Sequence, residues 1–232
     1  MCDKRIHYYL VLDTETANGL DDPIVYDVGG CVCDKQGRIY EKFSFVIRDI
    51  FVYERKLMES AYYAEKIPEY VESLRIKERT MVNFYEARHY ILDLIKKYNI
   101  KDVAAYNAHF DRNALNTTQR WLTKSKYRYF FPYGINFVCI WNMACQTLCQ
   151  RKTYREFCER NNFTSNRERN YSTSAETVYR YLILNPNFTE EHKGLDDVLI
   201  EVYIMRRCFE SHKAMPYGKG IRRSCWQSVK RV

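Results

Sequence analysis

The order of the strand-like and helix-like segments is the feature that most limits the folds open to this chain. Apolar, aromatic and β-branched residues predict strands over residues 7–12, 24–33 and 38–47, and a turn-forming sequence joins the last two as a hairpin. After that point, strand-like segments at 103–106 and 136–140 alternate with segments of helical periodicity. This order predicts an α/β domain with a mixed sheet and helices on its faces. The predicted helices cover 53–66, 83–98, 110–122, 141–149, 154–160 and 174–184, with a last one marked by Leu195, Val198, Leu199 and Val202.

The chain has 232 residues, enough for one large domain, which we place at residues 1–211, followed by a basic tail at 212–232. Its formal net charge of +8 attracts polyanions, although many basic proteins never bind nucleic acid. No run approaches the roughly 18–20 apolar residues that span a bilayer, and the first residues lack the pattern of a signal peptide. We therefore expect a cytoplasmic protein without a membrane partner.

The nine cysteines do not form a recognisable metal or disulfide pattern. None of them forms a Cys-x-x-Cys pair, and an apparently cytosolic chain of this length is not a typical disulfide scaffold. Zinc could be imagined on Cys139, Cys145, Cys149 and Cys158, but their spacing matches no usual zinc motif. Buried free thiols are the stronger interpretation, because cysteine behaves as a small hydrophobic residue.

Acidic residues that could carry chemistry stand at three places along the chain. Asp13 and Glu15 follow the first predicted strand in VLDTETANG, and their spacing of two puts both on one face, where they could share metal ions. The alternative is a solvated strand end. Asp111 lies in the first turn of a predicted helix, in YNAHFDRNAL, where an acid is also favoured by the helix dipole alone.

The third place is the segment EEHKGLDDVLIE, which contains His192 and Asp197. Five residues apart on one helix, these side chains would point about 140° away from each other. The better interpretation places the histidine in a loop and the aspartate on the helix that follows. The aspartate could then hold a metal ion, and the imidazole could approach the attacking water. From the residues of this segment alone, Asp196 is an alternative to Asp197 as the metal ligand.

Together, these residues resemble the DEDDh, or DnaQ-like, family of 3′–5′ exonucleases, in particular the proofreading exonucleases of the DNA polymerase III epsilon type. VLDTET looks like the family's Asp-x-Glu motif, NAHFDRNAL like its second motif, and HKGLDDV like its third, His-x-x-x-x-Asp, whose spacing selects Asp197. The motifs occur in the family's order, and the resemblance spans roughly residues 8–205. The chain departs from the pattern at residues 16–19, where the family often has Thr-Thr-Gly, and at Gly194, where alanine is frequent.

The resemblance implies an RNase H-like fold, with a five-stranded mixed sheet whose first three strands are antiparallel and with helices on both faces. It also implies two Mg²⁺ or Mn²⁺ ions. Asp13 would bridge them, Glu15 and Asp197 would complete the site of the ion next to the attacking water, and Asp111 would support the second ion. His192 would be the general base that takes a proton from water.

The resemblance further implies contacts with nucleic acid from five residues near the motifs: Thr14, Thr16, Ala17, Asn107 and Phe110.

We expect hydrolysis from the 3′ end of single-stranded DNA or of frayed duplex ends, releasing 5′-mononucleotides, with RNA as the open alternative. The segment 153–191 is longer than in compact relatives and could shape substrate choice. We see no convincing docking segment for a polymerase partner, and the compact build suggests a stand-alone nuclease of phage origin.

Two other interpretations compete with an active nuclease. A non-catalytic nucleic-acid-binding or polymerase-associated module could keep the fold and the basic charge, but it should have lost a metal ligand, and none is missing from the motifs. A basic protein whose motif matches arise by chance would not be expected to show three matches in the family's order.

Overall fold

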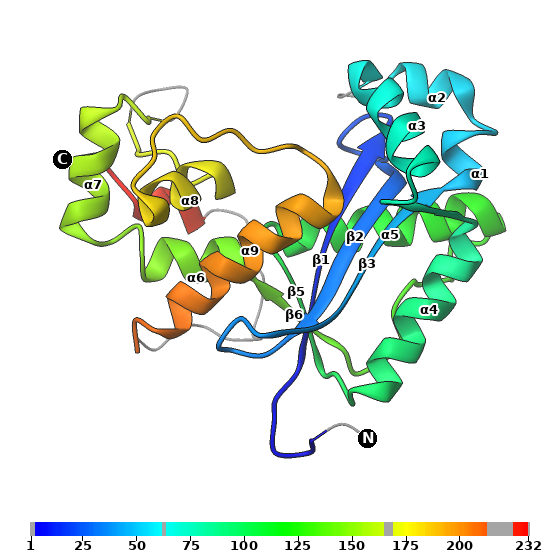
Figure 1. Cartoon of the computed structure of the whole chain (residues 1–232), viewed down its shortest axis with the longest axis horizontal. Helices are drawn as coiled ribbons and strands as arrows, with labels where there is room; N and C mark the ends of the chain where they lie inside the picture. The colour runs from blue at the N-terminus through cyan, green and yellow to red at the C-terminus, as the bar shows by residue number, and fades with distance from the viewer. Residues whose placement is uncertain (1–2, 62–63, 165–168, 213–224, 232) are drawn as a thin grey trace.

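The computed structural model describes residues 3–61, 64–164, 169–212 and 225–231. It contains a six-stranded mixed sheet in the order β4-β3-β2-β1-β5-β6 (Figure 1). The strands are β1 (Tyr9–Ala17), β2 (Ile24–Cys33), β3 (Ile39–Ile47), β4 (Thr80–Val82), β5 (Asp102–Ala105) and β6 (Asn136–Cys139). The first three strands are antiparallel, whereas β5 and β6 run parallel to β1. The predicted α/β class and the antiparallel opening are confirmed.

The predicted number of five strands is wrong, because β4 adds a sixth at one edge of the sheet. This strand has only three residues and pairs in parallel with the end of β3, from Phe45 opposite Thr80 to Ile47 opposite Val82. Three residues are too few to show an alternating pattern in sequence, so only pairing with β3 reveals the strand.

Most of the predicted helices are present, with ends shifted by a few residues. The helices are α1 (Arg48–Phe51), α2 (Arg55–Glu59), η1 (Ala64–Lys66), α3 (Ile67–Arg75), α4 (Phe84–Lys97), α5 (Ala108–Thr123), α6 (Ile140–Gln146), α7 (Lys152–Arg160), α8 (Ala175–Ile183), α9 (Gly194–Phe209) and η2 (Cys225–Ser228). A single helix over 53–66 was predicted wrongly: α2 and η1 are separate short turns there, and α3 follows them. By contrast, Asn83 and Glu86 form a capping box that starts α4 one residue after the predicted boundary.

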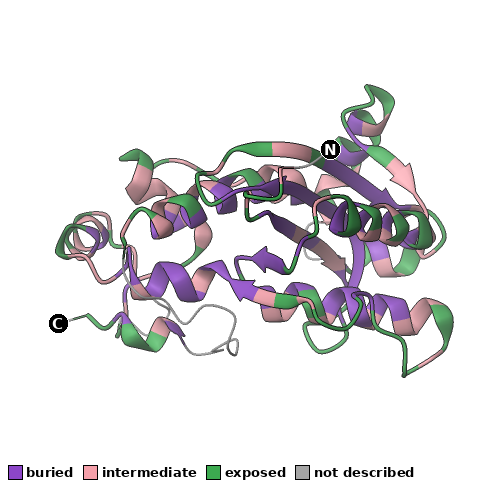
Figure 2. Ribbon diagram, turned by 90° about the horizontal axis from the view of Figure 1, so that it is seen from below, coloured by how far each residue is buried: buried purple, intermediate pink, exposed green. Residues whose placement is uncertain are grey.

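Two hydrophobic cores lie on the two faces of the sheet. Alternate residues of β1 divide between them, with Leu10 and Leu12 in one core and Tyr9 and Val11 in the other. Helices α4 and α5 cover the first face, and α6 to α9 cover the second. Every residue of β2 is buried, as expected for a central strand covered on both sides (Figure 2).

The described part of the predicted tail, residues 225–231, packs against the second core. Cys225 and Val229 are buried, Lys230 forms a β-bridge with Asn170, and Arg231 pairs with Glu159 at 2.8 Å. The domain boundary after residue 211 stays a prediction. Among the described residues, no helix combines the length and apolar character needed to cross a membrane.

Candidate active site

Asp13 and Glu15 lie inside β1 rather than after its end. The strand was predicted to stop at Leu12, but antiparallel pairing with β2 continues to Ala17, with Asp13 opposite Gly29 and Glu15 opposite Asp27. The two carboxylates are half-buried, and their spacing of two residues puts them on the same face of the strand.

The start of α9 rests directly on β2 at this point because two glycines meet there. A Cβ atom at Gly29 would lie 2.1 Å from the Leu195 backbone nitrogen, and one at Gly194 would lie 2.6 Å from the Gly29 nitrogen. The contact brings the first turn of α9 beside Asp13, whose strand partner is Gly29. Gly194, which departs from the family's frequent alanine, is therefore required for this close approach.

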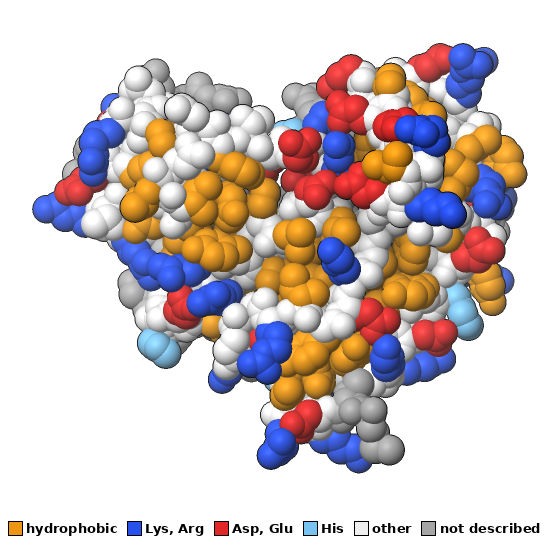
Figure 3. All heavy atoms as spheres, viewed as in Figure 1, with side chains coloured by type: hydrophobic (Ala, Val, Ile, Leu, Met, Phe, Trp, Pro, Cys, Tyr) orange, Lys and Arg blue, Asp and Glu red, His pale blue; other side chains and the backbone are white. Residues whose placement is uncertain are grey.

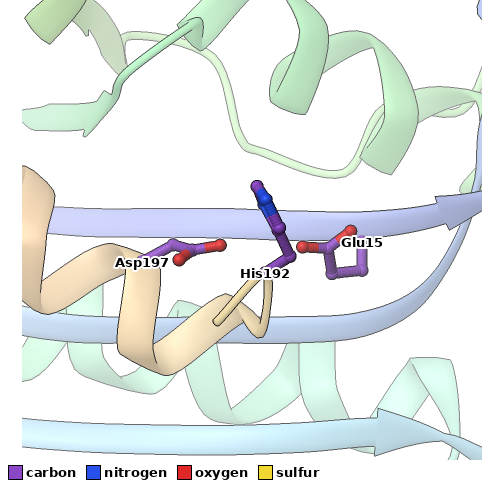
Figure 4. Close-up of side chains that lie close together, drawn as sticks. All are labelled: Glu15, His192 and Asp197. Carbon is purple, nitrogen blue, oxygen red and sulfur yellow. The ribbon is translucent and has the colours of Figure 1, made fainter. Parts of the chain in front are cut away.

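Glu15, His192 and Asp197 form a group that could hold a metal ion. Their ligand atoms all lie within 4.8 Å of one another. In Figure 4 the carboxylates of Glu15 and Asp197 point toward each other, with His192 between them. His192 has a φ of +49° in the loop before α9, and Asp197 lies in the first turn of that helix. The loop-then-helix arrangement expected for the pair is therefore present.

Asp111 reaches the same place from the first turn of α5. Its side chain is buried, and Oδ1 accepts hydrogen bonds from the Thr14 amide at 3.2 Å and the Thr14 hydroxyl at 2.9 Å. Because Thr14 directly follows Asp13, these bonds place Asp111 beside Asp13, and burial followed by the Asp111 charge raises the pKa of Asp13. The structure thus brings together all five residues that the motifs singled out.

Burial and mutual repulsion make four anions at this site unfavourable without a counter-charge. Burial, with a smaller contribution from the Asp197 charge, raises the pKa of Glu15 to about 9. Burial also raises the pKa of Asp111 and of Asp197 to about 7. Oδ1 of Asp197 is buried and has no hydrogen-bond partner among the described residues. Oxygen-rich groups of this kind fit a hard divalent cation, which would supply the missing positive charge.

Two further charged side chains at the site were not predicted. Lys66 donates a hydrogen bond to the Glu191 carbonyl, and its charge lowers the pKa of Glu15, His192 and Asp197. Figure 3 shows acidic side chains gathered, with basic ones among them, beside the hollow between the parts of the molecule that carry α3 and α8. For His192, burial is the larger cause of the lowered pKa, so the imidazole is neutral near pH 7.

The second is Glu201, which is only 3% exposed and lies one turn after Asp197 on α9. Its Oε2 has no hydrogen-bond partner in the described part of the chain. Burial, followed by the charge of Asp111, raises its pKa well above the usual range. The i, i+4 spacing from Asp197 could have indicated Glu201, whereas nothing in the sequence indicates Lys66.

Asp27 holds the start of α9 in place from the opposite strand. Its Oδ2 accepts hydrogen bonds from Arg79 at 2.9 Å, from the Tyr70 hydroxyl at 2.8 Å and from the Gly194 amide at 3.1 Å. Arg79 also lies 3.5 Å from Asp196, which therefore points away from the group formed by Glu15, His192 and Asp197. This buried network fixes which of the two neighbouring aspartates faces the site.

The residues expected to touch nucleic acid have different environments. Thr14 and Ala17 are buried, Thr16 and Phe110 are half-buried, and Asn107 is exposed at the residue preceding α5. The Thr14 hydroxyl is already engaged by Asp111. Contact of these five residues with nucleic acid stays a prediction.

Comparison with solved structures gives the same architecture. The chain shares its fold with exonuclease I. A zinc-bound complex of E. coli exonuclease I with single-stranded DNA matches with a TM-score of 0.53 at 13% identity, over 88% of this chain and 42% of that chain. E. coli exonuclease I with a dT13 oligonucleotide matches with a TM-score of 0.53 at 12% identity, over 89% and 42%. A product-bound exonuclease I matches with a TM-score of 0.50 at 13% identity, over 88% and 45%.

This chain therefore spans less than half the length of the exonuclease I chains that it matches. No family model matches the sequence. No curated protein matches it either.

Proposed function

We propose that this chain is a metal-dependent 3′–5′ exonuclease of the DEDDh type that acts on single-stranded DNA. The observation that carries the proposal is the convergence of Asp13, Glu15, Asp111 and Asp197 with His192, from three separate parts of the chain, in the fold of exonuclease I. A non-catalytic module would have no need to keep a repulsive cluster of buried carboxylates together with a neutral histidine.

Asp13, Glu15 and Asp197 would hold one Mg²⁺ or Mn²⁺ ion, and Asp13 with Asp111 would hold a second. Bound divalent ions supply positive charge that makes water more acidic and offsets charge on the phosphate. His192 accepts a proton from the attacking water, which its lowered pKa allows near neutral pH. Thr14 orients Asp111 through its two hydrogen bonds.

Single-stranded DNA is the proposed substrate because the matched exonuclease I structures include complexes with single-stranded DNA and a dT13 oligonucleotide. The net charge of +8 favours any polyanion and does not separate DNA from RNA. A cytoplasmic location, a phage source and the absence of a polymerase partner stay predictions.

Digestion of matched 5′-labelled DNA and RNA oligonucleotides tests the proposal. With Mg²⁺ or Mn²⁺ we expect a ladder that shortens from the 3′ end, faster on DNA, and no cleavage in EDTA. Asp13→Ala should abolish the ladder while circular dichroism shows that the fold is kept. Cleavage that survives Asp13→Ala would refute the assigned site. Binding without cleavage by the parent protein would favour the non-catalytic module, and faster cleavage of RNA would correct the substrate.

A further inference from the structure

A cavity separate from the carboxylate site lies on the same side of the sheet as α6. It has a volume of about 1080 Å³ and lies between α6, the residues that precede α8, and η2. Three aromatic and three polar side chains define it for this argument: Trp141, Tyr171, Trp226, Arg169, Gln227 and Lys230. The chain has only three tryptophans, and two of them line this cavity.

The aromatic rings of the cavity are held in place by hydrogen bonds at their edges. The Trp141 indole N–H donates to the Thr173 hydroxyl at 2.8 Å, and the Tyr171 hydroxyl donates to Glu159 at 3.0 Å. Trp226 lies in η2, whose neighbours Cys225 and Val229 are buried in the core. The polar edges of Trp141 and Tyr171 are thus satisfied, and Tyr171 is buried, so the half-buried rings of Trp141 and Trp226 are the ones that a ligand could stack on.

Charge at the cavity is positive. Arg169 and Lys230 are exposed at its rim, and neither forms an ion pair within the described ranges of the chain. Aromatic rings beside exposed cations are the combination that binds single-stranded nucleic acid, because bases stack on the rings and phosphates meet the cations.

Trp141 forms one edge of the cavity and directly follows β6. β6 is separated from β1 by β5 alone, so strand spacing puts the end of β6 roughly 10 Å from β1 across the sheet. Tyr106, directly after β5, holds this edge of the cavity: its carbonyl accepts a hydrogen bond from the Trp141 amide at 2.9 Å, and its hydroxyl donates to the Thr173 carbonyl at 2.6 Å.

We propose that this cavity binds unpaired bases of a nucleic-acid strand whose 3′ end lies at the carboxylate site. The inference rests on the proposed function for the position of the 3′ end, but binding at the cavity is a separate property. It gives a role to residues 169–173, which precede α8, and to Trp226, Gln227 and Lys230, which line the cavity.

Binding can be measured without cleavage, by fluorescence anisotropy of 5′-labelled dT12 and U12 in EDTA. Stacking of one base on an aromatic side chain typically strengthens binding by roughly fivefold to a hundredfold. We therefore expect Trp226→Ala to weaken binding about tenfold and Trp226→Phe to restore most of it. Trp121→Phe, at the far end of α5, is the matched control and should bind like the parent protein.

Lys230→Ala gives an independent test, because the side chain is exposed and its loss should not disturb folding. If Lys230 contacts one phosphate, the slope of log K against log salt should fall by about 0.7. Equal affinity of the parent, Trp226→Ala and Lys230→Ala proteins would overturn the inference even if the protein is an active nuclease. Weakened binding in both variants would support it even if no cleavage were found.

Discussion

Two adjacent aspartates at the start of α9 have opposite surroundings. Asp197 lies within 4.8 Å of Glu15 and His192, whereas the Asp196 side chain is 44% exposed and faces Arg79. Only Asp197 can therefore contribute an oxygen to the group that could hold a cation.

We expect Asp197→Asn to lower kcat/KM on single-stranded DNA by more than about 100-fold. Loss of groups that merely support metal ligands already lowers metal affinity or activity 10- to 100-fold, and Asp197 would be a ligand itself. Asp196→Asn, one residue away on the same helix, should change kcat/KM by less than about threefold. Steady-state kinetics with saturating Mg²⁺ measures both. Equal effects of the two substitutions would contradict the assigned orientation of α9.

At the scale of elements, the contact between α9 and β2 depends on two glycines and on the Asp27 network. Gly29 and Gly194 leave no room for a Cβ atom, and the Gly194 amide donates to Asp27. These contacts set the position of the turn that carries Asp197 and of the loop that carries His192.

Gly194→Ala should lower the free energy of unfolding by about 1–3 kcal/mol, because the added methyl group would push the helix away from β2. Gly19→Ala is the control, since nothing lies within 4 Å of a Cβ atom at that position. Urea denaturation measures both changes. If Gly194→Ala were as stable as the parent, the close approach of α9 to β2 would not be a requirement of the fold.

Removal of one partner from the buried pair of Asp27 and Arg79 should be costly. Arg79→Met leaves Asp27 as an uncompensated buried carboxylate, and we expect a loss of about 3–5 kcal/mol in unfolding free energy. Arg75→Met removes an exposed arginine that pairs with Glu72 and should change stability by less than about 1 kcal/mol. Thermal or urea unfolding separates the two, and a loss of similar size in both variants would be the contrary result.

At the scale of the whole molecule, the raised pKa values link stability to pH and to metal ions. Asp111 and Asp197 have pKa values near 7 and Glu15 near 9 in the folded protein, against ordinary values near 4. The folded state therefore holds these protons more tightly than the unfolded chain does. The contribution of these three groups to stability is therefore greatest at low pH and is lost as pH rises from about 4 through the folded-state values.

In EDTA, we expect the Tm to fall by roughly 5 °C or more between pH 5.5 and pH 8.5. Added Mg²⁺ or Mn²⁺ should raise the Tm most at the higher pH, since ions bind the deprotonated carboxylates. Differential scanning calorimetry gives both dependences. Glu15→Gln removes one titrating group and should flatten the curve, whereas a Tm that rises with pH in EDTA would show that the carboxylates do not repel one another in this way.

Much of the fold follows from local patterns in the sequence. The apolar run of β1, the hairpin of β2 and β3, and the periodic helices such as α4 and α9 were predictable, because each depends on residues a few positions apart. The same holds for the candidate site: the Asp-x-Glu spacing, the motif around Asp111 and the motif around His192 name five side chains that the structure brings together.

Features that depend on distant pairing were decided only by the tertiary structure. The strand β4 exists through its pairing with β3, and the segment 53–66 divides into short turns where a single helix was predicted. The motif spacing already selects Asp197 over Asp196, but the contact that holds Asp196 comes from Arg79, more than a hundred residues earlier in the chain. The aromatic cavity joins Trp141 to Trp226 in the same way. Local spacing determines which face of an element is apolar, but the partners of that face are set by packing across the whole chain.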